Sequence, residues 1–355
     1  MLNAQRLEFP GFVDVHVHFR DPGVPEAETA ESGLLAARAG GFAAVVTMPN
    51  TTPAGDSPEW VTRQLSLAGF PKIYPSACIT KRRLGHEVAD LERLAEAGAA
   101  FFTDDGSFVV DDKVMEAAIL RAADLNMTIC EHAMLPNDGV IRDSPLARKL
   151  GLPIIPVSAE TDAIRRDLSL CRVTGCRLHI QHISTAEGVE LVRSAQREGL
   201  PVTAEATPHH LLFAVEELSA DDANYKMAPP LGNREDRAEL RKAVKEGALM
   251  FATDHAPHPA ERKSLGFLKS ANGIIGLETA IAITYGVMVE EEGMPVESWA
   301  EAWWKLPRYL IRGIGELPTT ILSLAEERKV EVDKFFSRSR NCPYDGMIWR
   351  CWPCR

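Results

Sequence analysis

The sequence predicts an α/β fold in which eight parallel strands, each followed by a helix, close into a (β/α)₈ barrel. Three observations support this fold class. Short runs of apolar and β-branched residues alternate with helical patterns along the chain, and such alternation is typical of a parallel sheet that closes on itself. Glycines follow several of the helical patterns, as expected at helix ends. The length of 355 residues suits one large barrel with a small additional piece.

The strand and helix pairs follow one another in order. In the first half of the chain they are predicted at residues 12–19 and 29–39, 43–48 and 58–67, 73–79 and 90–97, and 99–103 and 114–125. In the second half they are predicted at residues 127–130 and 159–173, 177–183 and 187–197, 201–206 and 236–245, and 249–253 and 277–288. Apolar and β-branched residues favour each strand, and Ser57-Pro58 is a typical start for the second helix.

The last part of the chain breaks this rhythm. Residues 319–324 predict one more strand, and residues 341–355 are rich in Trp, Cys and Pro. Cys342, Cys351 and Cys354 offer three thiols, but a closed zinc site needs four ligands and no fourth lies near them in the sequence. We therefore interpret the tail as an appendage with reduced thiols.

Composition limits the classes of function. The chain has 39 basic and 50 acidic residues and a formal net charge of -11, which argues against a general binder of nucleic acid or of anionic membranes. No apolar run reaches the roughly 18 residues of a membrane span, and residues 1–12 lack the pattern of a secretion signal. Seven scattered cysteines are too few for a disulfide scaffold. We therefore expect a cytoplasmic protein with neither nucleic-acid nor membrane partners, in which local positive charge holds any anionic substrate.

Histidines and carboxylates gather at the carboxyl ends of the predicted strands, where the active site of a barrel lies. Seven of the ten histidines lie there: His16, His18, His132, His179, His182, His255 and His258. Alternation along the first strand predicts two faces, one with Asp14, His16, His18 and Arg20 and the other with Val13, Val15, Val17 and Phe19. Residues 81–83 are expected to form a solvated loop.

This set of residues is typical of a catalytic metal centre. Imidazole and carboxylate groups suit zinc and similar ions, and the absence of cysteine argues against a structural zinc site. Four histidines and one or two carboxylates exceed the needs of one tetrahedral ion, so two ions that share a carboxylate and a hydroxide are favoured. Alternation leaves Asp104 and Asp105 both open as the shared carboxylate. Asp254 also acts as general base and acid, which predicts hydrolysis of an amide or a related bond.

Five segments of the chain form a specific combination. They are residues 10–23 (PGFVDVHVHFRDPG), 48–51 (MPNT), 103–106 (TDDG), 203–210 (TAEATPHH) and 252–258 (ATDHAPH). Together, over about residues 10–340, they resemble the dihydroorotases, and more narrowly the bacterial type I enzymes of the amidohydrolase superfamily. The resemblance implies reversible cyclisation of N-carbamoyl-L-aspartate to L-dihydroorotate in pyrimidine biosynthesis.

The resemblance also implies two zinc ions (Zn²⁺). His16 and His18 would hold one ion, and His132 and His182 would hold the other. Asp105 would bridge them, where many members of the superfamily use a carboxylated lysine. The same resemblance implies that His179 supports the ligands, and that His209 and His210 are structural or support the site without binding metal.

Further roles follow from the same resemblance. Asp254 would be a metal ligand and would carry the proton. Arg20, Asn50 and His258 would bind the carboxylates of the substrate, and they supply the donor groups that the negative net charge requires.

The chain departs from the family pattern at several positions. Ala228 stands where many relatives have a substrate-binding Asn, and Asn272 replaces a common Phe. Relatives also have longer ends that together build a small β-sandwich. We therefore expect the barrel over residues 10–314, with residues 1–9 and 315–355 as a truncated remnant of the β domain and a tail.

Two alternatives share this metal scaffold. A hydantoinase or allantoinase is one, and Arg20, Asn50 and the aspartate bridge favour the dihydroorotase instead. The other is a low-activity dihydroorotase-like partner of aspartate transcarbamoylase. Such chains tend to lose metal ligands, whereas this chain keeps all six. A homodimer, or a complex with that transcarbamoylase, is the expected assembly.

Overall fold

Parallel strands form the centre of the computed structural model, which describes residues 5–67 and 69–354. The strands are β2 (Phe12–Val17), β3 (Phe42–Thr47), β4 (Lys72–Pro75), β5 (Thr128–Glu131), β6 (Arg177–Ile180), β7 (Val202–Ala206) and β8 (Met250–Phe251). They form one sheet of β2–β4 and another of β5–β8. Parallel bridges join the two sheets, from Ala77 to Phe102, from Phe102 to Ile129, and from Val17 to His255. The ring is closed, and the predicted barrel is confirmed.

The predicted fourth strand, residues 99–103, is reduced to a single bridging residue. The N–H of Phe102 donates to the carbonyl of Thr128 at 3.0 Å, and its carbonyl accepts from the N–H of Cys130 at 2.8 Å. The chain then turns, because the hydroxyl of Thr103 accepts the N–H of Asp105 at 3.0 Å. The position of this strand was predicted, but its length was overestimated.

Strand β2 does not alternate regularly. Its register against β3 shifts between Asp14 and Val17. Val13 and Val15 pack inside the barrel with residues such as Met250, whereas Val17 packs in the cluster that faces the helices. The expectation that Val13 and Val15 face away from the histidines is therefore wrong, because a β-bulge breaks the period of two.

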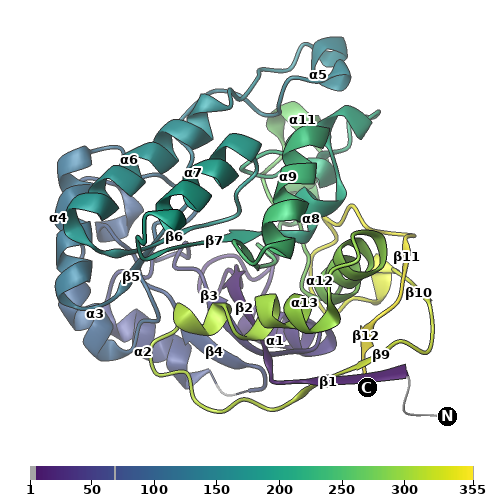
Figure 1. The fold of residues 1–355 in the computed structure, drawn as a ribbon, viewed down its shortest axis with the longest axis horizontal. Helices are drawn as coiled ribbons and strands as arrows, with labels where there is room; N and C mark the ends of the chain where they lie inside the picture. The colour runs from purple at the N-terminus through teal and green to yellow at the C-terminus, as the bar shows by residue number, and fades with distance from the viewer. Residues whose placement is uncertain (1–4, 68, 355) are drawn as a thin grey trace.

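Helices cover the outside of the barrel (Figure 1). Those that follow the predicted pattern are α1 (Ala30–Ala39), α2 (Pro58–Ser66), α3 (Leu91–Ala97), α4 (Asp112–Asp124), α6 (Ser158–Thr174), α7 (Ala186–Arg197), α9 (Arg234–Lys245) and α12 (Ala280–Thr284), which continues as the π-helix η5 (Tyr285–Glu291). Side-chain caps start several of them, and the hydroxyl of Ser57 accepts the N–H of Trp60 at the start of α2. Gly98 and Gly175 end α3 and α6 in the left-handed conformation.

Shorter elements fill the loops. They are α5 (Pro145–Leu150), α8 (Pro208–Leu212), α10 (Ala260–Lys263), α11 (Gly266–Lys269) and the 3₁₀ turns η2 (Lys81–Arg83), η3 (Val215–Glu217), η4 (Ala223–Tyr225), η6 (Pro307–Tyr309) and η7 (Val332–Lys334). The sequence did not predict α13 (Val296–Trp304). Its buried Trp299 packs edge-on against Phe12 of β2, with ring centroids 5.6 Å apart, so α13 helps to cover the barrel.

The two ends of the chain meet in a separate antiparallel sheet. It consists of β1 (Arg6–Phe9), β9 (Thr320–Ser323) and β12 (Trp352–Pro353), and β10 (Arg328–Lys329) pairs with β11 (Ile348–Trp349). Figure 1 shows β1 beside β9 and β12 near both termini. The strand expected at residues 319–324 is thus present, while the division into a barrel and a remnant domain stays a prediction. Residues 1–4 and 355 of that remnant lie outside the described residues. Within residues 5–67 and 69–354, no helix has the length and apolar character needed to cross a membrane.

Candidate functional site

A cavity of about 270 Å³ opens at the carboxyl ends of the barrel strands. Its lining comes from loops after most of the strands: His18, Arg20, Asn50, Arg83, Asp105, Gly106, His132, Met134, His182, Ala228, Asp254, Ala256, His258, Asn272 and Gly273. Of the predicted site residues, only His16 is missing from this lining, and it lies fully buried next to Asp105 and Asp254. The structure therefore brings the predicted residues together.

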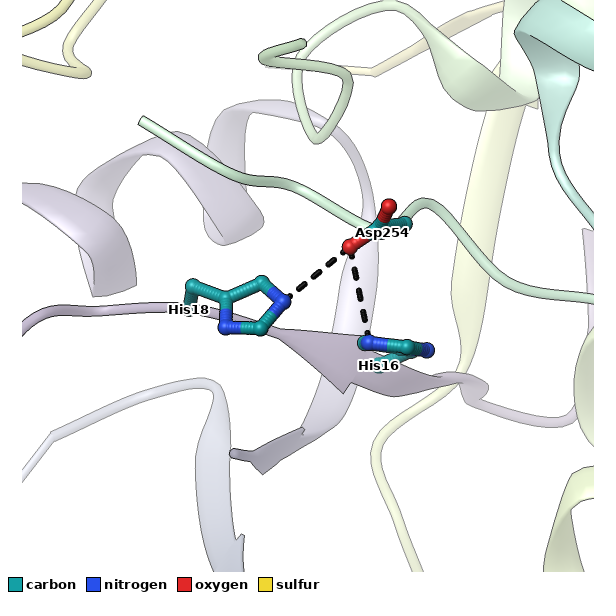
Figure 2. A group of neighbouring side chains, drawn as sticks. All are labelled: His16, His18 and Asp254. Atoms are coloured by element: carbon teal, nitrogen blue, oxygen red, sulfur yellow. Dashed lines mark hydrogen bonds and ion pairs between the residues drawn. The ribbon is translucent and has the colours of Figure 1, made fainter. Parts of the chain in front are cut away.

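His16, His18 and Asp254 form the first group of candidate ligands (Figure 2). One carboxylate oxygen of Asp254 lies 3.0 Å from Nε2 of His18 and 3.4 Å from Nε2 of His16. Figure 2 shows the other oxygen turned away from both imidazoles. Asp254 adopts a left-handed backbone with a φ of 47°, just after Thr253, whose N–H donates to Asp14 at 3.0 Å. The ligand atoms of the group lie within 4.8 Å of one another, close enough for one cation.

Asp105 lies among four imidazoles. Its Oδ1 is 3.2 Å from Nε2 of His16, and its Oδ2 is 3.3 Å from Nε2 of His18. The same Oδ1 is 3.6 Å from Nδ1 of His132 and 3.6 Å from Nε2 of His182. Those two nitrogens are 3.0 Å apart. A carboxylate that directs its two oxygens toward different imidazoles suits a bridging position.

The neighbouring Asp104 points elsewhere. Its carboxylate accepts the N–H of Ile79 at 2.9 Å and the N–H of Thr80 at 3.1 Å, and it also accepts the Thr80 hydroxyl. Asp104 therefore holds the loop after β4. Alternation left both aspartates open as the shared carboxylate, and the geometry favours Asp105.

The atoms of this cluster fit a divalent cation. Nε2 of His16 and Oδ1 of Asp105 are buried without a hydrogen-bond partner among the described residues. An unsatisfied buried polar atom costs about 1–3 kcal/mol, and a cation between the two would remove that cost. Besides the first group, His16, Asp105 and His182 form a second candidate metal-binding group. All the donors are imidazole nitrogens or carboxylate oxygens, which suit zinc.

Glu205 on β7 belongs to the site, although the sequence analysis gave it no role. Its carboxylate lies 2.6 Å from Nδ1 of His16 and 2.9 Å from Nε2 of His179, and it accepts the N–H of His182 at 3.2 Å. Burial opposes its ionisation, but His16 and then His179 lower the pKa of Glu205 to about 2. An ionised Glu205 fixes the N–H of His16 on Nδ1, which leaves Nε2 free to bind a cation. The sequence signal that could have revealed Glu205 is its position two residues after Thr203, which places both side chains on the same face of β7.

The candidate carboxylate-binding residues lie beside the metal ligands. Arg20 donates to the carbonyl of Pro257 at 3.4 Å, and burial lowers the pKa of Arg20 to about 10, so it stays charged. Oδ1 of Asn50 lies 2.8 Å from Nδ1 of His18, so Asn50 also orients that imidazole. Nε2 of His258 lies 2.6 Å from the carbonyl oxygen of Asn272. All three face the same cavity.

Arg83 corrects the interpretation of residues 81–83 as a solvated loop. Arg83 lines the cavity, and its guanidinium donates to the carbonyl of Asp105 at 2.6 Å and to the hydroxyl of Ser107 at 3.0 Å. The backbone of Arg83 is left-handed with a φ of 54°, as is that of the exposed Arg82. The sequence carries no local signal for this turn.

The remaining histidines behave as expected. His179 lies between Glu205 and the hydroxyl of Thr203, at 2.9 and 2.8 Å, and thus supports the site from behind. His210 lies 3.1 Å from the carbonyl of Pro229. Burial lowers the pKa of His209 to about 3, so His209 is neutral. Neither His209 nor His210 belongs to the two candidate metal-binding groups of the described residues. The predicted ligand His132 is also outside both groups, but its Nδ1 lies 3.6 Å from Oδ1 of Asp105.

Comparisons with known proteins agree with this geometry. The sequence profile of the "Dihydro-orotase-like" family matches residues 5–188. The chain is 41% identical to a dihydroorotase of Geobacillus thermodenitrificans and 40% identical to one of Halalkalibacterium halodurans. Each alignment covers 98% of this chain and 85% of the relative.

Solved structures share the fold. The L-hydantoinase (dihydropyrimidinase) of Arthrobacter aurescens superimposes with a TM-score of 0.85 at 25% identity, covering 98% of this chain and 83% of that one. The dihydroorotase of Saccharomyces cerevisiae, in complex with 5-fluoroorotic acid, gives 0.78 at 18% identity and covers 99% and 98% of the two chains. With an identity of 41% over almost its whole length, the chain belongs to the dihydroorotase family.

Proposed function

We propose that this protein is a metal-dependent dihydroorotase that interconverts L-dihydroorotate and N-carbamoyl-L-aspartate. The observation that carries the proposal is the position of Arg20 and Asn50 in the same cavity as Asp254 and the clustered imidazoles. A guanidinium and an amide beside the reacting centre suit a substrate that carries a carboxylate. The small-molecule substrate would enter at the open end of the barrel.

The residues present would hold two zinc ions. His16, His18 and Asp254 would hold one, and His132 and His182 the other, with Asp105 between them. The chemistry that such a pair supplies is the activation of water and the polarisation of the amide carbonyl. Glu205 supports this arrangement because it orients His16 through Nδ1.

Asp254 would move the proton. One of its oxygens faces His16 and His18, and the other is turned away from them. Burial opposes ionisation, but His16 and His18 lower the pKa of Asp254 below its ordinary value, which favours the ionised form that can accept a proton. It would accept the proton of the attacking water and donate it to the ring amide nitrogen as the C–N bond breaks. Cyclisation runs through the same steps in reverse.

The substrate carboxylates would be bound by Arg20, Asn50 and His258. Arg20 would pair with a carboxylate through its charged guanidinium, and Asn50 would add a side-chain N–H donor. His258 lies next to Asn272 in the same cavity. These roles orient the ring amide toward the metal ligands.

The test is hydrolysis of L-dihydroorotate by the purified, zinc-loaded protein, followed as the loss of ultraviolet absorbance. We expect turnover that a chelator abolishes and that added zinc restores. Zinc content measured on the same samples should be two ions for each chain. Absence of turnover from protein with both ions bound would refute the proposal.

A hydantoinase is the second candidate, because the structure of the Arthrobacter L-hydantoinase superimposes with a TM-score of 0.85. Parallel assays with hydantoin and allantoin separate the two, and faster hydrolysis of either than of L-dihydroorotate would favour the second candidate. Assays with and without aspartate transcarbamoylase test the predicted partnership. Full activity of the purified chain alone would exclude dependence on that partner.

A further inference from the structure

Residues 271–273 form one wall of the cavity. Asn272 and Gly273 line it, and the carbonyl of Asn272 lies 2.6 Å from Nε2 of His258. Gly273 has a φ of 144°, and a Cβ there would lie 2.6 Å from the carbonyl oxygen of Ala256. The segment is irregular, without helix or strand. Its position must therefore be fixed by contacts from outside the segment.

The side chain of Lys263 lies directly behind this wall. Its Nζ donates to the carbonyls of Ala271 and Gly273, each at 2.9 Å, and to the carbonyl of Lys226 at 3.1 Å. Lys263 is only 9% exposed. Three acceptors match the three N–H groups of an ammonium. Lys263 thus joins the end of α10 to both ends of the wall.

Packing alone does not explain a lysine at this position. Burying a charged group costs free energy unless it is hydrogen-bonded, and a methionine would fill a similar volume without that cost. Burial, and then the charge of Lys226, lower the pKa of Lys263 to about 7, whereas its direct partners are backbone carbonyls. The contacts that offset the cost are therefore those that hold residues 271–273.

We propose that Lys263 is a positioning residue of the active site, which fixes the carbonyls of Ala271 and Gly273 and thereby the direction in which Asn272 and His258 face the substrate. The inference rests on the proposed function, because the cavity wall matters only if substrate binds there. Lys263 does not line the cavity, and it belongs to neither candidate metal-binding group of the described residues. It would act on substrate binding through the wall.

The first test is the kinetics of Lys263→Met. This variant keeps the length of the side chain but removes three hydrogen bonds to the wall. We expect KM for L-dihydroorotate to rise roughly tenfold or more, while kcat changes by less than about threefold and zinc content stays the same. Lys263→Arg, which keeps the charge and the donors, should recover part of the affinity. Lys269→Met is the matched control, because Lys269 is exposed on the neighbouring α11.

The second test measures the wall itself. Amide hydrogen exchange of residues 271–275 is recorded in the zinc-loaded protein without substrate. We expect faster exchange in Lys263→Met than in the wild type, and wild-type exchange in Lys269→Met. A role limited to the global fold would speed exchange throughout the barrel rather than in this segment.

Several outcomes would overturn the proposal. Unchanged KM and unchanged exchange in a folded Lys263→Met protein would do so, and so would a fall in kcat that accompanies loss of zinc. If the Met variant does not fold, Lys263→Gln, which keeps two N–H donors, takes its place with the same two readouts. If the wild type fails to hydrolyse L-dihydroorotate, the proposed function fails, whereas the exchange comparison still decides whether Lys263 holds residues 271–273.

Discussion

Asp254 is both a candidate metal ligand and the proposed proton carrier. Its replacement should slow the reaction without changing the fold. Asp254→Asn keeps the size of the side chain but cannot accept the proton of the attacking water. Because general acid and base catalysis contributes about 10²–10⁴-fold, we expect kcat to fall by at least that factor while the circular dichroism spectrum stays unchanged. Zinc content is measured in parallel, since Asp254 also lies among the candidate ligands. Near-normal turnover would remove Asp254 from the proton pathway.

Glu205 should set the affinity for metal. Glu205→Gln removes the charge that holds the N–H of His16 on Nδ1. Loss of such a supporting carboxylate typically weakens metal binding about 10–100-fold, and competition with a chromogenic chelator measures this directly. Glu131→Gln is a matched control, because Glu131 is as buried as Glu205 but belongs to neither candidate metal-binding group of the described residues. Equal metal affinity in both variants would contradict the role of Glu205.

Residue types and strand ends predicted most of the site. His16 and His18 were found because histidines near strand ends are chemically distinctive, and the structure places both in the cluster. Glu205 was missed because a glutamate on a strand has many structural explanations until its partners are known. Arg83 was missed because its hydrogen-bond partners, Asp105 and Ser107, are 22 and 24 residues away in the sequence.

At the scale of the element, helix and strand type were predicted better than strand geometry. The bulge in β2 between Asp14 and Val17 lets both His16 and Val15 face inward, which strict alternation forbids. Nothing in the local pattern marks it. Asp14 stabilises the bulge, since it accepts the N–H of His16 at 3.2 Å and the N–H of Thr253 from the neighbouring chain segment at 3.0 Å. The second of these contacts is a long-range one, so it could not be foreseen from the strand alone.

The hydroxyl of Thr284, at the junction between α12 and η5, accepts two buried hydrogen bonds from α13. Thr284 accepts the indole N–H of Trp299 at 3.2 Å and of Trp303 at 3.1 Å. Thr284→Val keeps the shape but leaves two buried donors unsatisfied, each at a cost of about 1–3 kcal/mol. We expect chemical denaturation to show that loss of stability, with unchanged kcat for the folded protein.

A suitable control for that substitution is Thr174→Val. The hydroxyl of Thr284 donates to the carbonyl of Ala280 at 2.8 Å, and the hydroxyl of Thr174 likewise donates to the carbonyl four residues earlier, that of Leu170, at 2.8 Å. Thr174 is only part-buried, however, and accepts no hydrogen bond from a tryptophan among the described residues. Equal effects of the two substitutions would show that the indole contacts contribute little.

At the scale of the whole molecule, the C-terminal part of the chain is more than an appendage. Residues 337–341 return to the barrel, where the hydroxyl of Ser337 donates to Glu28 at 2.6 Å and Asn341 donates to the carbonyl of Ala256 at 3.0 Å. These contacts join positions that are 309 and 85 residues apart in the sequence. No local pattern predicts them, which is why the sequence indicated the strand at residues 319–324 but not the return of the chain to the active site.

The contact of the C-terminal segment with Glu278 should make the free energy of unfolding depend on pH. Glu278 accepts the N–H of Ser337 at 3.1 Å, yet burial raises the pKa of Glu278 from 4.5 to about 7. The folded chain therefore keeps a proton that the unfolded chain releases, so the free energy of unfolding falls as pH rises from about 4.5 to about 7. Glu278→Gln removes this loss, and its gain in melting temperature should be larger at about pH 8 than at about pH 5. An equal gain at both values would contradict the raised pKa.

Asn341 connects the returning C-terminal segment to residues that line the cavity. Its Nδ2 donates to the carbonyls of Ala256 and Gly273, each at 3.0 Å, and its Oδ1 accepts the N–H of His258 at 3.2 Å. Asn341→Ala frees all three groups, so we expect KM to rise roughly three- to tenfold with little change in kcat. Arg338→Ala is the control, since Arg338 lies exposed on the same segment.

Asn341 and Lys263 hold the same atom, the carbonyl oxygen of Gly273, and their effects should therefore not be additive. Residues that share a partner show coupling of about 0.5–3 kcal/mol in a double-mutant cycle. In Lys263→Met the segment 271–273 is already less firmly held, so the further loss of the Asn341 hydrogen bonds should have a smaller effect. The double variant should therefore raise KM by less than the product of the two single effects. Strict multiplication of the effects would mean that the two side chains act on separate parts of the cavity.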